Sequence, residues 1–250
     1  MKTHHLEHQC LEYQHPQQLV KIILIILSFI GLSLVSGQIT NQAGEGLPAC
    51  GYEDRATAFT SYDDWQVTLL DTLYKLPADY APTDLVPVRQ AGFDSDLLMR
   101  GFVIEDLRAL REAALAAGHP LAVQSAYRSY SYQDRTFDYW VNLQGRQAAL
   151  LSSARPGHSE HQLGTAVDFR SANGPPAWDL ADWADTPAGA WTVANAWRYG
   201  FALSYPKNTQ EITCYIYEPW HYRYVGRELA AQLQARGITL REWLWELQPY

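Results

Sequence analysis

The spacing of apolar residues predicts short helices and short strands mixed along the chain. Within 102–117 apolar residues recur every three or four positions, which indicates a helix that Gly118 ends. Further helices are expected over 132–150, 187–200, 228–236 and from 239 onward, and strands over 121–125, 166–169 and 201–205. Because no regular strand–helix–strand repeat appears, the pattern predicts an α+β fold.

An apolar stretch near the N-terminus, residues 22–35, contains no charge and follows Lys21. With Ser36 and Gly37 after it, this stretch is typical of a signal peptide, so we expect cleavage after Gly37 and export to the cell envelope or beyond. The alternative is a membrane anchor over 19–35. The fourteen uncharged residues at 22–35 span only about 21 Å as a helix, which is less than the roughly 30 Å of a hydrocarbon core. We therefore divide the chain into a leader (1–37), a linker (38–62) and one folded domain (63–250).

Composition narrows the choice of partners. The hydrophobic fraction of 47% is enough for a core, and the net charge of −8 is unchanged when the leader is removed. This acidity argues against nucleic acid, and the only expected membrane contact is the N-terminal segment itself. Loss of the leader also removes Cys10 and leaves Cys50 and Cys214. In an oxidising compartment these two form either a disulfide or two unrelated thiols.

Histidines and carboxylates cluster in two segments that suit a metal site. Outside the leader the histidines are His119, His158, His161 and His221. A hydrolytic zinc site needs three protein ligands and one open position. Such a set is offered by His161, Asp168 and His221. Glu218 stands three residues before His221, where it could act as the base that takes a proton from the bound water. The alternative is an ordinary hydrogen-bonded His–Asp pair. Arg128, expected at a strand end, suits a substrate carboxylate or a structural salt bridge.

Three blocks of sequence then resemble a known family. They are SAYRS at 125–129 with Gln133, PGHSEHQLGTAVD at 156–168 and EPWHYRYVG at 218–226. Together they are similar to the VanY-type D-alanyl-D-alanine carboxypeptidases, the LAS zinc metallopeptidases of peptidase family M15, subfamily B. The blocks stand in the family order and the likeness spans roughly 76–226. It implies a single domain in which helices flank a small antiparallel sheet that carries the zinc site (the LAS/hedgehog-type fold).

The resemblance also implies roles for individual residues. Zn²⁺ would be held by His161, Asp168 and His221, with Glu218 activating the zinc-bound water and Arg128 stabilising the oxyanion. The pocket for the terminal D-alanine would include four further residues: Ser125, Gln133, Ser159 and Tyr205. His158 stands at a variable family position, so we expect it at the rim of the site and not among the ligands.

The implied activity is zinc-dependent removal of the terminal D-alanine from peptidoglycan stem peptides. One alternative on the same scaffold is an L,D-carboxypeptidase that acts on tetrapeptide stems, and a more distant one is a phage-type endopeptidase. Another is a non-catalytic wall-binding domain that keeps zinc for structure, and a last one is a substrate-binding module without zinc. The presence of Glu218 and Arg128 favours an enzyme over the two non-catalytic alternatives, because a structural zinc site needs neither a base nor a cationic group that binds an anion.

Overall fold

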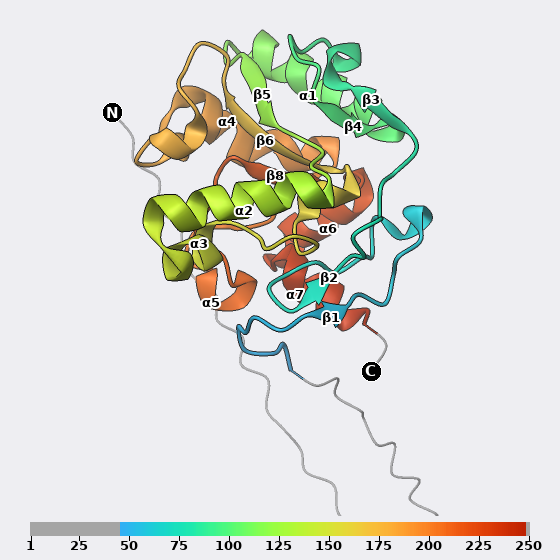
Figure 1. Cartoon of the computed structure of the whole chain (residues 1–250). Helices are drawn as coiled ribbons and strands as arrows, with labels where there is room; N and C mark the ends of the chain where they lie inside the picture. Colours follow the sequence, from blue (N-terminus) through green and yellow to red (C-terminus); the bar gives the residue numbers. More distant parts are fainter. Residues whose placement is uncertain (1–45, 249–250) are drawn as a thin grey trace, which may run out of the picture. The chain divides into compact units, whose positions relative to one another are not determined.

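The computed structural model describes residues 46–248 and has a four-stranded antiparallel sheet as its centre (Figure 1). The strand order is β5, β6, β8, β7. Their bounds are β5 (Leu121–Ser125), β6 (Ala166–Ser171), β7 (Phe201–Leu203) and β8 (His221–Tyr224). Two smaller ladders accompany it: β1 (Arg55–Ala56) pairs in parallel with β2 (Tyr74–Lys75), and β3 (Leu85–Pro87) pairs antiparallel with β4 (Leu98–Arg100).

Helices surround this sheet, and α1, α4 and α6 contact its strands. The α-helices are α1 (Ile104–Ala116), α2 (Tyr130–Gln144), α3 (Arg146–Ser152), α4 (Pro187–Asn195), α5 (Gln210–Thr213), α6 (Arg227–Arg236) and α7 (Leu240–Glu246). The predicted α+β class with a small antiparallel sheet is therefore confirmed. Within 46–248, no helix combines the length and the apolar character that crossing a membrane requires.

The two faces of the sheet have different characters because side chains alternate along each strand. On β6 and β8 one set of alternate residues, including Val167, Phe169 and Tyr222, is buried in the main hydrophobic core with Leu107 and Leu110 of α1. Full burial of each such side chain contributes about 1.5–3 kcal/mol. The other set holds polar residues, and this polar face carries the candidate site.

Several predicted elements differ from the observed ones. The single helix expected over 132–150 is two helices, because Gly145 adopts a φ of 84° and ends α2 before α3 begins. The expected helix over 187–200 is α4 followed by a 3₁₀ turn, Ala196–Tyr199, before Gly200. Strand β8 was not predicted. By contrast, the helix expected from 239 onward is observed as α7, and its N-cap Thr239 forms the reciprocal hydrogen bonds of a capping box with Glu242.

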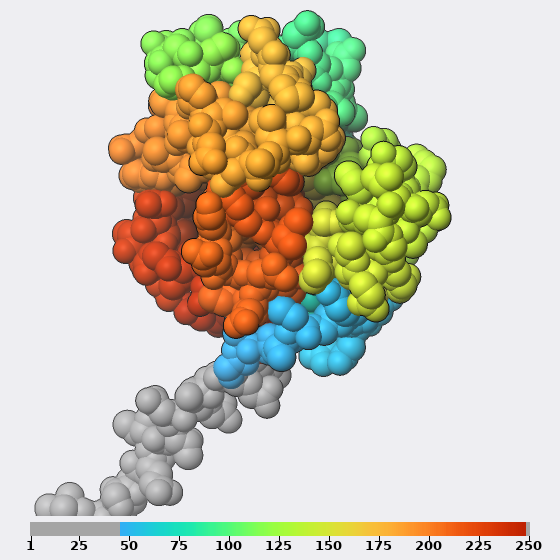
Figure 2. All heavy atoms as spheres, turned by 90° about the vertical axis from the view of Figure 1, so that its left-hand side faces the viewer, coloured from blue at the N-terminus to red at the C-terminus, as the bar shows by residue number. Residues whose placement is uncertain are grey.

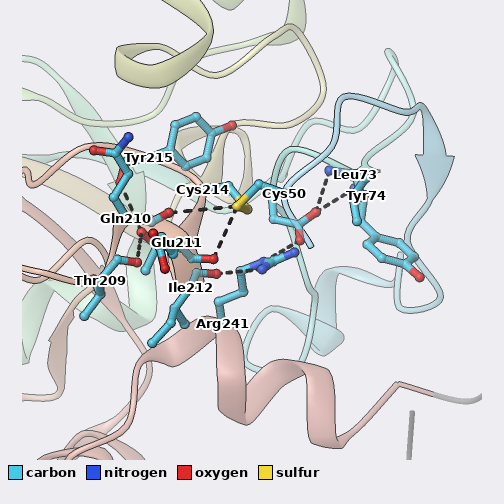
Figure 3. Close-up of a disulfide and its surroundings, with 12 residues drawn as sticks. Cys50, Leu73, Tyr74, Thr209, Gln210, Glu211, Ile212, Cys214, Tyr215 and Arg241 are labelled. Carbon is cyan, nitrogen blue, oxygen red and sulfur yellow. Dashed lines mark hydrogen bonds and ion pairs between the residues drawn. A yellow bond between two sulfur atoms is a disulfide. The ribbon is translucent and has the colours of Figure 1, made fainter. Parts of the chain in front are cut away.

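The N-terminal segment, described from residue 46, is tied to the rest of the domain at several points. Cys50 and Cys214 form a disulfide across 164 positions of sequence (Figure 3). Asp54 accepts hydrogen bonds from Lys75 and Arg155. The expected linker over 38–62 is thus, in its described part, attached to the domain, while the leader over 1–37 lies outside the described residues.

Candidate metal and substrate site

Strand register brings the polar residues of the site together. Asp168 of β6 stands directly opposite His221 of β8 on one side and Ser125 of β5 on the other. A bulge between Val123 and Ser125 shifts the β5 register, so that Val123 stays opposite Phe169 in the core while Ser125 turns to the polar face. Directly opposed residues have Cβ atoms about 4.5–5.5 Å apart, so the sheet itself sets the spacing of these groups.

The predicted ligands converge on one point. His161 lies in a 3₁₀ turn, Glu160–Leu163, just before β6. One ligand atom each from His161, Asp168 and His221 lies within 4.8 Å of the others, and all three residues are buried. These three form the only such group of histidine, cysteine, aspartate and glutamate found within residues 46–248.

Hydrogen bonds indicate which imidazole nitrogens face this point. His161 Nδ1 lies 2.6 Å from the Ala126 carbonyl oxygen and donates to it, which leaves Nε2 as the lone-pair nitrogen. That Nε2 is buried, has no hydrogen-bond partner among the described residues, and lies 3.3 Å from Asp168 Oδ2. His221 directs Nδ1 to Asp168 Oδ1 at 3.0 Å. A buried, unpartnered nitrogen in a set of two histidines and one aspartate fits zinc.

The pKa shifts of Asp168 and His161 leave both groups in the protonation state that a metal ligand requires. Burial alone would raise the pKa of Asp168, but His161 and His221 hold it well below its usual range. Burial lowers the pKa of His161 to about 4, so this ring is neutral and able to ligate. Burial also raises the pKa of Glu218 to about 8, in spite of the nearby His221. A carboxylate and a neutral imidazole therefore face the same buried point.

Glu218 and Arg128 are held beside the ligands by backbone contacts. The Glu218 amide donates to the Tyr205 carbonyl at 3.1 Å, and the Glu218 carbonyl accepts from the His221 amide at 3.1 Å. The Arg128 amide donates to the His161 carbonyl at 3.2 Å, and its Nη2 lies 3.8 Å from Asp168 Oδ2. Arg128 Nε is buried without a hydrogen-bond partner in the described structure, which leaves a donor available to a substrate oxygen.

A cleft of about 480 Å³ contains every predicted site residue. Its lining includes Ser125, Arg128, Gln133, Ser159, His161, Asp168, Tyr205, Glu218 and His221. In Figure 2 the segments that form its walls, α2 with α3, the stretch around 178 and the stretch 205–220, border one another on the face turned to the viewer. The sequence thus led to residues that are far apart in the chain and adjacent in the fold.

The predicted pocket residues differ in what they can offer to a substrate. Gln133 is buried, donates from Nε2 to the Ala154 carbonyl at 2.7 Å and keeps an unpartnered Oε1 within the described structure. Ser159 accepts from the His161 amide and so also caps the turn that carries this ligand. The Tyr205 ring packs 4.9 Å from the His221 ring.

One prediction about this region is wrong, and several residues were missed. His158 is not at the rim: it is buried, and its ring nitrogens lie 2.8 Å from the Asp71 carbonyl oxygen and 3.0 Å from Asp54 Oδ1. Half of the missed wall residues are aromatic: Tyr132, Tyr139, Trp140, Trp178, Tyr215 and Trp220. Glu160 was also missed, although it stands inside the quoted block between Ser159 and His161.

Comparison with known proteins agrees with this geometry. The family described as VanY, D-alanyl-D-alanine carboxypeptidase, matches residues 96–227, which carry all the candidate ligands. The chain belongs to the VanY family. The D-alanyl-D-alanine carboxypeptidase of Enterococcus faecalis is 32% identical over 190 residues, 72% of this chain. YodJ of Bacillus subtilis is 40% identical over 183 residues, 71% of this chain. In both cases the match covers 66% of the relative's own length.

Solved structures of VanY-type proteins share this fold. The LdcB LD-carboxypeptidase is 39% identical, with a TM-score of 0.62 over 72% of this chain and 86% of its own. The vancomycin-resistance D,D-pentapeptidase VanY, solved in complex with Zn(II), is 32% identical, with a TM-score of 0.62 over 72% of this chain and 99% of its own. A structure of VanYB contains D-alanine-D-alanine. The donor set of this chain fits zinc, and a related protein has been solved with zinc bound.

Proposed function

We propose that this VanY-family chain is a zinc carboxypeptidase that removes the terminal D-alanine from peptidoglycan stem peptides. The observation that carries the proposal is the placement of Glu218 and Arg128 in one cleft with three buried ligand candidates. A structural zinc site would need neither group. The Zn(II) and D-alanine-D-alanine complexes of related proteins support the same assignment.

The residues of the site suggest how the reaction proceeds. His161, Asp168 and His221 would hold zinc, which supplies Lewis acidity that polarises a carbonyl and lowers the pKa of water. Glu218 takes the proton from the attacking water and passes it to the leaving amine. Positive charge at the neighbouring site favours the ionised form of this carboxyl, the form that accepts a proton. Arg128 donates hydrogen bonds to the oxygen on which negative charge develops.

A comparison of two substrates tests this proposal. Zinc-loaded protein is incubated with pentapeptide and tetrapeptide stems, and the products are separated by HPLC and identified by mass. The proposal predicts release of one D-alanine from the pentapeptide. If zinc is bound and neither peptide is cut, the domain is not catalytic on these stems.

A second activity has its own support. The LdcB LD-carboxypeptidase is 39% identical to this chain, whereas the D,D-pentapeptidase VanY is 32% identical. Preferred release of D-alanine from the tetrapeptide in the same assay would identify this chain as an L,D-carboxypeptidase.

Export completes the proposal, since the substrate lies outside the cytoplasm. The Cys50–Cys214 disulfide supports it, because structural disulfides persist mainly in oxidising compartments. Mass spectrometry of the N-terminus from cells tests it: a mature chain that starts at Gln38 indicates a cleaved signal peptide. A chain that retains 19–35 in the membrane fraction indicates an anchor, and an uncleaved chain in the cytosol would refute export.

A further inference from the structure

We propose that Glu160 is a positioning residue that orients His221 as a metal ligand. This inference rests on the zinc site described above. Glu160 neighbours the first ligand, His161, in sequence, but its side chain reaches the third: Oε2 lies 2.9 Å from His221 Nε2. Since His221 Nδ1 faces Asp168, the two nitrogens of this ring contact two different carboxylates.

The Glu160 carboxylate is itself fixed at both oxygens. Ser204 Oγ donates to Oε2 at 2.6 Å, and Arg223 Nη1 donates to Oε1 at 3.1 Å. Arg223 is fully buried, and its Nη2 donates to the backbone carbonyls of Trp65 and Thr68 at 2.6 and 2.9 Å. Because Arg223 and His221 are alternate residues of β8, they project from the same face of that strand. The carboxylate is therefore held in one place by two residues of β8 and by Ser204, which follows β7.

This arrangement selects one form of the His221 ring. An ionised carboxylate can only accept hydrogen bonds, so the proton of a singly protonated His221 belongs on Nε2. The lone pair then lies on Nδ1, the nitrogen that faces Asp168. A carboxylate behind a ligating histidine also increases the basicity of the nitrogen in front, and loss of such a partner typically weakens metal binding about 10- to 100-fold.

A purely structural role, as the ion-pair partner of Arg223, would not explain why the second oxygen of Glu160 faces His221. Glu160 could neutralise Arg223 with one oxygen and leave the other to backbone amides. Instead the hydrogen bonds of Oε2 within the described structure go to His221 and Ser204. Burying a carboxylate is costly, and here the second oxygen is directed to a candidate ligand.

The chain contains a matched control for the test. Asp71 and Arg241 form a second buried ion pair, with Oδ2 of Asp71 2.7 Å from Nε of Arg241, and no hydrogen bond joins either side chain to the candidate ligands. Asp71→Asn should lower the thermal stability of the metal-free protein and leave zinc affinity unchanged. This variant therefore shows how far the loss of a buried carboxylate alone changes stability and zinc affinity.

The experiment measures the zinc dissociation constant by competition with a chelator, together with the melting temperature of the metal-free protein. Glu160→Ala is expected to weaken zinc binding about 10- to 100-fold, and Glu160→Gln, which keeps an acceptor without its charge, to weaken it less. Asp71→Asn should stay within about twofold of wild type. Wild-type zinc affinity in Glu160→Ala would overturn the proposal and leave Glu160 a structural role. Because zinc affinity is read without peptide hydrolysis, this result stands or fails separately from the proposed activity.

If the Glu160 variants do not fold, the wild-type protein still decides the question. Nitrogen-15 NMR of the zinc-loaded protein reports which His221 nitrogen carries the proton. The proposal predicts a protonated Nε2, hydrogen-bonded and slow to exchange with solvent. A metal-bound Nε2 would overturn it.

Discussion

Removing the disulfide should cost this domain a large part of its stability. Cys50 and Cys214 are separated by 164 positions, so the bond closes a long loop in the unfolded chain. The chain-entropy relation gives about 5 kcal/mol for a loop of this length, and measured losses for native disulfides run to about 2–5 kcal/mol. The Asp54 ion pairs of the same segment are individually weaker, because Asp54 is half exposed and such surface ion pairs contribute about 0–1 kcal/mol each.

Urea unfolding of the Cys50→Ala/Cys214→Ala variant measures the effect. We expect the free energy of unfolding to fall by at least about 2 kcal/mol relative to wild type, because the unfolded chain regains conformational freedom. Wild-type protein under reducing conditions is the control, since it loses the bond but keeps both sulfur atoms (Figure 3). A loss below about 1 kcal/mol in both samples would refute the entropic reasoning.

Two further predictions concern Arg128 and His158. Arg128→Lys is expected to lower kcat by about 100- to 1,000-fold, as the loss of an oxyanion donor does, at unchanged zinc content; an unchanged kcat would remove Arg128 from the reaction. Burial, with Arg155 nearby, lowers the pKa of His158 below its ordinary value of 6.5. The unfolded chain therefore binds the additional proton first, so stability is present above about pH 6.5 and falls as the pH drops through the folded pKa. Urea titrations at pH 7 and pH 5 should show a smaller loss for His158→Gln than for wild type, and equal losses would contradict the assignment.

Much of the fold follows from local sequence rules. The apolar positions of α1 are buried as their spacing predicts, and the Thr239 capping box begins α7. Strand β8 escaped prediction because it has only four residues and two of them, His221 and Arg223, are polar side chains that are buried only in the folded chain. Its Arg223 is buried with partners from distant parts of the chain, the Glu160 carboxylate and the carbonyls of Trp65 and Thr68. Such a pairing cannot be read from local pattern.

In the candidate site, the ligands and the base could be predicted from the sequence, but the residues placed by strand pairing could not. The ligand set and the base follow from residue chemistry and from the resemblance, because each stands in a distinctive block. The bulge in β5 that turns Ser125 toward Asp168 depends on strand pairing and left no local signal. The position of Glu160 behind His221 likewise depends on how β8 lies against β6. Sequence therefore indicated the candidate ligands and the candidate base, and tertiary structure indicated the residue that we propose orients one of those ligands.

The rate of D-alanine release by Glu218→Gln at full zinc loading decides whether this cleft is the catalytic site we describe. The substitution keeps the shape of the side chain and removes its capacity to accept a proton. We expect one zinc per chain, as in wild type, and a kcat lower by about 100- to 10,000-fold, the usual contribution of a general base. A zinc-loaded variant that releases D-alanine at a rate close to that of wild type would contradict the role of Glu218 and with it the proposed mechanism.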